Sequence, residues 1–259
     1  MTVISRLPVK GLVYGLVLIF AVVFVTSENG FAVASQTNTA KTSVFCKSLD
    51  SKSASLLTRI DALTAKLTSA WNKRDQNFTS KWQEIDKNVA TKRSQADSLR
   101  FNDYAKIEAK AKTDTQVQAV RAYENSINSA IGNRRASYDT ARQTFRTGVK
   151  SAIEGRRSTV TTQLSTYQNS VNSAIKEAKG VCDSSTKTSA VIKQSLQSSL
   201  KLAQTTYKIS RSNDSSVNDQ IKLLANARDV SFRLADQVFQ TSASAASGAL
   251  KQAFDDDSI

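Results

Sequence analysis

Two cysteines are the residues of this sequence whose chemistry is easiest to assign. Cys46 and Cys182 are the only cysteines, and there is no histidine. A zinc site or a Cys–His nucleophile therefore lacks the ligands and the base that it needs. The pair predicts a structural disulfide, a bond that forms and persists in exported proteins. Two free buried thiols are the alternative.

A run of cations between residues 134 and 157 is the second group that could bind a ligand. It contains two pairs of adjacent arginines 22 residues apart, with further cations between them: Arg134, Arg135, Arg142, Arg146, Lys150, Arg156 and Arg157. Such a basic stripe could bind a polyanion, for example DNA, teichoic acid or an anionic lipid surface, through charge alone. We favour the other interpretation, a solvated helix face, because no nucleic-acid recognition motif accompanies the charge.

The parts of an enzyme active site are otherwise missing. The sequence has no Gly-rich phosphate loop and no nucleophile elbow. Its carboxylates are scattered singly, and we interpret Asp75, Glu84, Asp86 and Asp97 as solvated partners of nearby Lys and Arg. We therefore predict a protein that is not an enzyme and has no cofactor, no metal and no small-molecule substrate.

The N-terminus has the features of a signal peptide. Early cations precede an apolar run from Gly11 to Val25, and small residues end at Ala34. We predict a signal peptide over residues 1–34, cleaved after Ala34, and a flexible linker over 35–45. An uncleaved membrane anchor is the alternative, since the run is just shorter than a full span. Either way the protein is expected to be secreted, periplasmic or on the cell surface.

Long helices are expected because 259 residues contain one Pro and eight Gly. From Leu49 onward apolar residues recur at spacings of three and four, with a longer period of eleven. The expected apolar face consists of Leu49, Leu56, Ile60, Leu63, Leu67, Trp71, Phe78, Trp82, Ile85, Val89, Ala96 and Leu99. The aromatic residues on this face are expected to belong to the core.

A second helical stretch repeats in units of 22 residues. The segment Ile127-Asn-Ser-Ala-Ile131 recurs as Val149-Lys-Ser-Ala-Ile153 and as Val171-Asn-Ser-Ala-Ile175. Aromatic residues follow the same interval at Tyr123, Phe145 and Tyr167. Eleven residues in three turns is 3.67 per turn, which predicts a nearly straight or faintly right-handed packing seam.

A helix start is predicted between these stretches. Thr113 and Gln116 have the spacing of a capping box, in which Gln reaches back to the N–H of the cap residue. Asp114 is midway between the two cysteines, so a reversal near 113–115 would bring both cysteines to one end. We predict an all-α fold with a long antiparallel, coiled-coil-like hairpin over 46–182, closed by the disulfide. Four shorter helices are the alternative.

Two more helices are expected in residues 183–259, packed on the base of the hairpin or on each other. Whether 212–216 forms a turn between them is left open. Charge separates the two parts: residues 35–182 carry 25 Lys and Arg against 13 Asp and Glu, while residues 183–259 carry 9 against 8. The basic excess therefore belongs to the expected hairpin.

The segment Glu108-Ala-Lys-Ala-Lys-Thr-Asp-Thr-Gln-Val-Gln-Ala-Val120, with the 22-residue units and Cys182, carries a resemblance. It is similar to a group of uncharacterised exported helical proteins from candidate-phylum bacteria. The resemblance covers most of the chain after residue 34. It implies a bacterial source, and it brings no catalytic or binding residues.

These features together predict a structural or interaction protein. We expect a rod-like helical spacer or scaffold at the cell surface, with protein partners or self-association, for example as a dimer. Binding of a polyanion or an anionic membrane surface through the basic hairpin is the alternative function.

Overall fold

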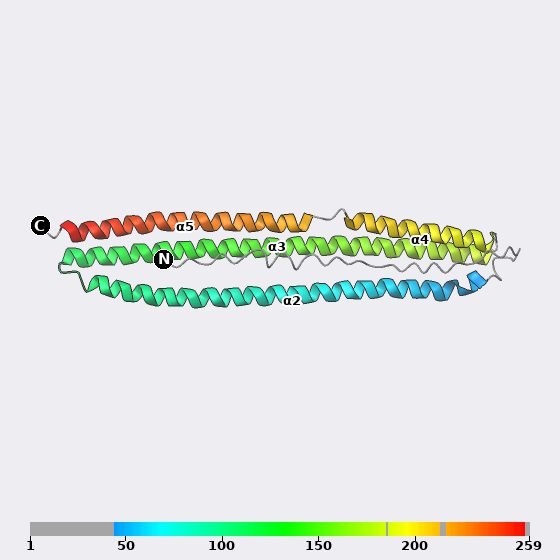
Figure 1. Cartoon of the computed structure of the whole chain (residues 1–259), viewed down its shortest axis with the longest axis horizontal. Coiled ribbons are helices and arrows are strands. Elements are labelled where there is room, and N and C mark those ends of the chain that lie inside the picture. Colours follow the sequence, from blue (N-terminus) through cyan, green and yellow to red (C-terminus); the bar gives the residue numbers. More distant parts are fainter. Residues whose placement is uncertain (1–43, 185, 213–215, 257–259) are drawn as a thin grey trace. The chain divides into compact units, whose positions relative to one another are not determined.

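The computed structural model describes residues 44–184, 186–212 and 216–256, and this part of the chain is helical without strands (Figure 1). The four helices are α2 (Val44–Glu108), α3 (Asp114–Ser184), α4 (Ser189–Ser212) and α5 (Ser216–Asp256). The predicted all-α class is confirmed. The predicted signal peptide and nearly all of the predicted linker lie outside the described residues.

The connection between α2 and α3 is a short turn stabilised by side-chain capping. Gln116 N–H donates to Thr113 Oγ1 at 3.2 Å, which makes Thr113 the cap of α3. Gln116 Oε1 accepts the N–H of Lys112 at 2.7 Å. This contact satisfies the N–H of the residue before the cap, which is left without a helical partner where the chain turns.

The contacts divide the chain into two compact units. Unit 1 contains the described residues up to Thr64 together with Ile153–Gln220, and unit 2 contains Ala65–Ala152 together with the described residues from Ile221 onward. Each unit therefore combines a part of α2, a part of α3 and one further helix. We describe the two units separately.

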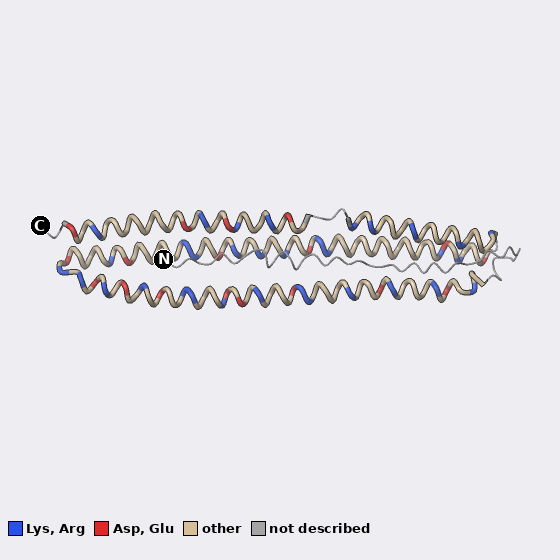
Figure 2. The backbone as a smooth tube through the Cα atoms, viewed as in Figure 1, with Lys and Arg blue, Asp and Glu red and all other residues tan. Residues whose placement is uncertain are grey.

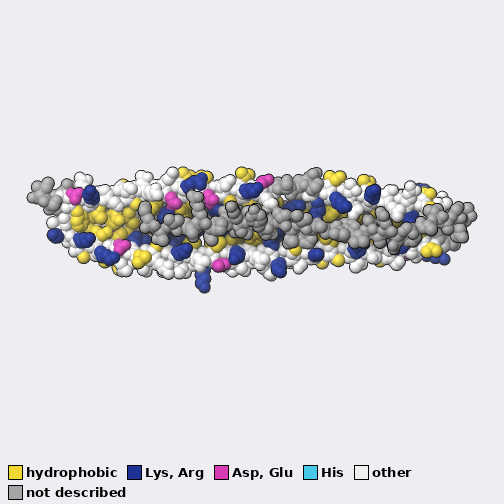
Figure 3. All heavy atoms as spheres, viewed as in Figure 1, with side chains coloured by type: hydrophobic (Ala, Val, Ile, Leu, Met, Phe, Trp, Pro, Cys, Tyr) yellow, Lys and Arg dark blue, Asp and Glu magenta, His cyan; other side chains and the backbone are white. Residues whose placement is uncertain are grey.

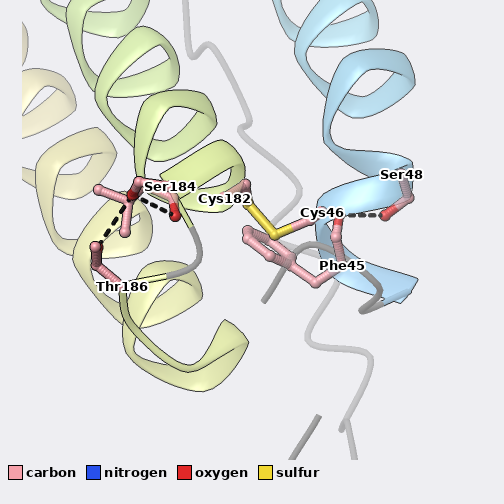
Figure 4. The surroundings of a disulfide bond; sticks show 7 residues. Phe45, Cys46, Ser48, Cys182, Ser184 and Thr186 are labelled. Carbon is pink, nitrogen blue, oxygen red and sulfur yellow. Dashed lines mark hydrogen bonds between the residues drawn. A yellow bond between two sulfur atoms is a disulfide. The ribbon is translucent and has the colours of Figure 1, made fainter. Parts of the chain in front are cut away.

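The core of unit 1 lies around the disulfide. Cys46 of α2 and Cys182 of α3 are bonded, with their Cα atoms 5.9 Å apart, so the pair predicted from the sequence is at disulfide distance. The ring of Phe45 lies beside the bond (Figure 4). Buried Leu49 and Ile192 complete this cluster. Helices α2, α3 and α4 therefore all contribute to one apolar contact.

Further along unit 1, α3 and α4 meet through aromatic and polar side chains. The rings of Tyr167 and Tyr207 are stacked with centroids 5.2 Å apart, and both residues are buried. Gln163 Nε2 donates to the carbonyl oxygen of Ser210 at 3.0 Å near the end of α4. These contacts place α4 on the part of α3 that precedes Cys182.

Unit 2 packs α3 between α2 and α5. Tyr104 of α2 meets Tyr123 of α3 edge to face at 6.0 Å between ring centroids. On the α5 side, Tyr138 and Phe232 have centroids 4.3 Å apart. A Cβ at Gly148 would lie 2.6 Å from Leu224 Cδ2, so glycine permits the close approach of α5 at that point. This position of α5 differs from the predicted packing on the hairpin base or on the other C-terminal helix.

Burial along both long helices follows positions eleven residues apart. On α3, six positions of one such series are buried and the seventh, Tyr138, is half-buried; the six are Gln116, Ile127, Val149, Val160, Val171 and Cys182. On α2, the corresponding series runs Leu49, Ile60, Trp71, Trp82, Arg93 and Tyr104, of which all are buried or half-buried. The inner face of α2 therefore includes an arginine.

Two residues that we assigned to the apolar face of α2 are on the outside. Leu99 is 66% exposed, and Ala96 is exposed as well. The inner positions in this part of the helix are occupied by Arg93, Asp97 and Arg100. The prediction was wrong here because it assigned the inner face from apolar residues. The positions that face inward in this part of the helix are charged residues.

Helix α4 ends at Ser212 and α5 begins at Ser216, with residues 213–215 outside the described part. Among the described residues, no helix combines the length and the apolar character that a membrane span requires.

Candidate functional site

The candidate site is an open groove of about 600 Å³ in unit 2, between α2 and α3. Its α2 wall consists of Asp86, Val89, Ala90 and Arg93, which follow one another at helical spacings and so share one face of the helix. Its α3 wall consists of Asp139, Thr140, Arg142, Gln143, Thr144 and Arg146. The groove therefore contains three arginines and two aspartates.

Ion pairs between α2 and α3 hold the walls of the groove together. Arg93 donates two hydrogen bonds to the Asp139 carboxylate, at 2.9 and 2.8 Å. Arg146 donates two to the Asp86 carboxylate, at 2.8 and 2.6 Å. Two parallel bonds to one carboxylate fix both the distance and the direction of a guanidinium. Both walls are thus set by paired side chains from opposite helices.

Arg142 is held differently from the other two arginines. Among the described residues it makes a single hydrogen bond, from Nη1 to Asp139 at 3.2 Å. Its guanidinium lies over the rings of Tyr138 and Phe232, 5.8 and 5.7 Å from their centroids. Its side chain is 20% exposed. Arg142 is therefore mostly removed from water but has only part of its donors satisfied.

The pKa shifts of the groove residues follow from burial and from the ion pairs. Hydrogen bonds from Arg146 lower the pKa of Asp86, and hydrogen bonds from Arg93 lower the pKa of Asp139. Burial lowers the pKa of Arg142, and the like charges of Arg93 and Arg146 lower it further, against the attraction of Asp139. Burial is thus the main cause of the lowered pKa of Arg142, and the charges around it act in both directions.

Most of the predicted basic stripe is engaged with carboxylates of unit 2. Arg134 pairs with Asp236 of α5 at 2.6 Å, and Arg135 donates to Asp97 of α2 at 2.9 and 2.5 Å. Arg146 is paired within the groove and lies over the Trp82 ring at 5.5 Å. These side chains hold helices together more than they present charge to solvent.

The second arginine pair of the stripe lies in unit 1. Arg156 and Arg157 are half-buried, and burial together with the charge of Arg211 lowers the pKa of Arg156. Lys150 is exposed in unit 2. The visible face of the molecule has Lys and Arg scattered among other side chains rather than gathered in one patch (Figure 3). The seven cations are thus distributed over two differently packed units.

Asp86 and Asp97 were interpreted as solvated partners of nearby cations; both are more than a third exposed, and Asp97 does pair with Arg100 on its own helix, but the structure adds partners on the other helix. Both carboxylates bind arginines of the opposite helix, and hydrogen bonds from Arg135 lower the pKa of Asp97 to about 2. Charges of both signs are interspersed along α2 and α3 (Figure 2). Sequence spacing within one helix cannot reveal such pairs, because the partners lie far apart in the chain.

The charged groove residues Arg93 and Asp139 were not singled out from the sequence. A signal for Arg93 existed, because it follows Trp82 by eleven residues in the series that begins at Leu49. A charged residue at a position that the period assigns to the seam indicates an interhelical ion pair. Asp139 lies beside the buried face of α3 and has no comparable signal.

Comparison of the chain with protein-family models, with curated proteins and with solved structures gave no match.

Proposed function

We propose that this protein is a non-enzymatic, exported structural protein in which two paired long helices form a rod-like spacer or scaffold at the cell surface. The observation that carries the proposal is the length of α3, a single helix of 71 residues, beside 65 residues in α2. At a rise of 1.5 Å per residue, each helix extends over roughly 100 Å. An element of that length spans distance more readily than it builds a compact active site.

Pairing of α2 and α3 along their whole length is part of the proposal. In unit 2, the residue numbers of the partners on α3 decrease as those on α2 increase, as expected for antiparallel helices. The pairs are Asp86 with Arg146, Arg93 with Asp139, and Asp97 with Arg135. In unit 1, Asp50 pairs with Lys179, close to the disulfide. The same antiparallel direction in both units supports one continuous hairpin.

The eleven-residue burial series supports a nearly straight seam. Buried positions on α3 recur at eleven, from Ile127 to Val149 in two steps and on to Val171 in two more. The seven-residue spacing of a left-handed heptad coil is also buried in the unit 1 part of α3, from Ile153 to Ala174, so the straight seam is proposed mainly for the part of α3 in unit 2. A straight pair of helices suits a spacer because it keeps its direction over many turns.

Export is proposed from the disulfide and the N-terminal sequence. A bond between Cys46 and Cys182 is compatible with an oxidising compartment. Exposed apolar side chains on the outer faces of α4 and α5 support the proposed contacts with proteins; they include Leu202, Ile209, Leu223, Leu234 and Val238. Binding of an extended polyanion has less support, because Arg134, Arg135 and Arg146 are held by carboxylates.

Small-angle X-ray scattering of the protein with its disulfide intact tests the proposal. A rod of roughly 100 Å has a radius of gyration near 30 Å, against roughly 17 Å for a compact domain of similar size. A compact value would contradict the proposal.

A matched pair of glycine variants sharpens the measurement. A Cβ at Gly155 of α3 meets nothing within 4 Å, so Gly155→Ala should leave the scattering unchanged. Gly155→Pro removes a helical hydrogen bond and kinks the helix, so it should shorten the particle. Equal scattering from the two variants would indicate that a continuous α3 does not set the length.

A further inference from the structure

We propose that the groove lined by Arg93, Arg142 and Arg146 binds a compact oxyanion, a phosphate or sulfate group, with Arg142 as its main contact. This site goes beyond the proposed structural role and does not depend on it. It also differs from the basic stripe expected from the sequence, because it is one local cluster rather than a long charged face.

The first argument is the balance of charge. The groove holds three guanidinium groups and two carboxylates, and Asp139 is shared between Arg93 and Arg142. Arg93 and Arg146 each have a carboxylate bound through two hydrogen bonds. Arg142 has one long bond, so the excess positive charge lies on it. An oxyanion would neutralise this charge and accept the donors that remain.

The second argument is the position of Arg142. Contacts with the rings of Tyr138 and Phe232, at 5.8 and 5.7 Å from their centroids, help to hold its guanidinium beside the groove. A guanidinium that is already ordered loses little side-chain entropy when it binds a ligand. Arg142 is also largely desolvated, with 20% of its side chain exposed, so its electrostatic attraction is less screened than on an open surface.

The third argument is the remaining lining of the groove. Thr140, Gln143 and Thr144 provide hydroxyl and amide donors on the α3 wall, whereas Val89 and Ala90 provide an apolar part of the α2 wall. Polar donors suit the oxyanion, and the apolar part suits an organic group attached to it. A volume of about 600 Å³ exceeds what a lone phosphate needs. A phosphate or sulfate ester is therefore the ligand class that uses the whole groove.

Equilibrium dialysis of the purified protein, disulfide intact, against inorganic phosphate and against phenyl phosphate at low and constant ionic strength tests the site. We expect one site with a Kd on the order of 0.1 to 1 mM for phenyl phosphate and weaker binding of inorganic phosphate. Equal affinity would assign the site to free oxyanions. A Kd above roughly 10 mM for both probes would overturn the proposal.

A site-specific signal comes from Trp82, whose ring lies under Arg146 at 5.5 Å. In a Trp71→Phe background Trp82 is the remaining tryptophan. Its fluorescence should change during the titration with the same Kd that dialysis gives. A tryptophan signal that fails to follow binding would place the anion elsewhere.

Matched variants separate a local site from diffuse charge. Arg142→Gln removes the proposed contact, and Arg121→Gln removes one exposed cation from the same helix outside the groove. We expect Arg142→Gln to raise the Kd about tenfold and Arg121→Gln to raise it less than twofold. Equal effects would overturn the proposal.

Asp139→Asn provides a second test that does not rely on the fold of the Arg142 variant. The substitution removes a carboxylate that competes with the ligand, so phosphate should bind about threefold more tightly. A merely structural role of this cluster would leave affinity unchanged or weaken it, which would contradict the site. Circular dichroism confirms that each variant remains helical.

Discussion

Units 1 and 2 stabilise similar thin helical seams in different ways. Unit 1 has a covalent bond between α2 and α3, surrounded by an apolar cluster with Leu49 and Ile192. Unit 2 has bidentate arginine–carboxylate pairs between the same two helices, at Asp86 and Asp139 among others. A narrow seam buries little apolar area per turn, so both units need interactions beyond hydrophobic packing.

The two solutions differ in the state on which they act. A disulfide restricts mainly the unfolded chain, so its effect does not depend on pH or salt in the ordinary range. Ion pairs act in the folded state, and their contribution changes with protonation and with ionic strength. The comparison therefore predicts that different conditions destabilise the two units.

Reduction of the disulfide should have the largest effect, and unit 1, which contains the bond and its apolar cluster, should open first. The bond joins residues separated by 136 positions. The chain-entropy model gives about 5 kcal/mol for so long a loop, and measured values are often lower, so we expect a loss of about 4 kcal/mol. Hydrogen exchange with mass spectrometry, with and without reductant, should show protection falling in unit 1 much more than in unit 2.

The double variant Cys46→Ser/Cys182→Ser is the control for this experiment, since its exchange should not respond to reductant. An equal fall in protection in both units would break the comparison, because the bond would then stabilise the chain as a whole.

Local patterns in the sequence predicted much of this fold. Scarce Pro and Gly and the apolar spacing indicated long helices, the lone cysteine pair indicated the disulfide, and Thr113 with Gln116 marked the start of α3. The helices and the cap depend on residues that are close together in the sequence. The disulfide could be predicted because each cysteine has only one other cysteine with which it can pair. These predictions need no knowledge of how the helices pack.

The candidate site was predictable only in part. Arg142 and Arg146 were selected as cations, and Asp86 was noticed, but their interhelical pairing was not foreseen. A charged residue within a helix has the same local pattern whether it faces water or a partner on another helix. Arg93 shows that the position of a residue in the eleven-residue burial series, rather than its type, indicates whether it faces another helix.

Matched valine truncations test whether the apolar part of the seam is equivalent in the two units. Val171 in unit 1 and Val149 in unit 2 are both on α3, with exposures of 0% and 1%. Substitution of either by Ala removes two buried methyl groups and should cost about 2 kcal/mol. Urea denaturation measures the loss. A much smaller loss of unfolding free energy for Val149→Ala would indicate that polar contacts contribute more to the stability of unit 2 than its apolar core does.

Acidification should weaken unit 2 selectively. The pKa values of Asp86, Asp97 and Asp139 are lowered by their arginine partners, that of Asp97 to about 2. A carboxyl with a depressed folded pKa contributes stability above its unfolded pKa and loses it as pH falls toward the folded value. We therefore expect unit 2 to lose roughly 1.5 kcal/mol in total between pH 4.5 and pH 2, after allowance for solvent screening.

Hydrogen exchange over this pH range, corrected for the intrinsic exchange rate, measures the effect unit by unit. Salt provides the control, because 1 M NaCl should reduce the difference between pH 4.5 and pH 2 by screening the pairs. A larger loss in unit 1 than in unit 2 would contradict the assignment of ion pairs as the stabilising feature of unit 2.

The smallest expected effect comes from removing one carboxylate from unit 2. Asp97 accepts two hydrogen bonds from Arg135 and pairs with Arg100 at 2.8 Å. Asp97→Asn should cost about 1 kcal/mol by thermal denaturation, because Arg135 is left with weaker acceptors while being only 29% exposed. A double-mutant cycle with Arg135→Gln isolates the pair from the other contacts of Asp97.

The pair of Asp103 and Lys106 is the matched control on the same helix. Both side chains are largely exposed, at 66% and 72%, and their contact lies within one turn of α2. Asp103→Asn should change stability by less than about 0.3 kcal/mol, because a solvated pair gains little over its hydrated partners. Equal costs at Asp97 and Asp103 would show that the number of charges, rather than the bridge between α2 and α3, stabilises unit 2, and the contrast with the disulfide of unit 1 would then fail.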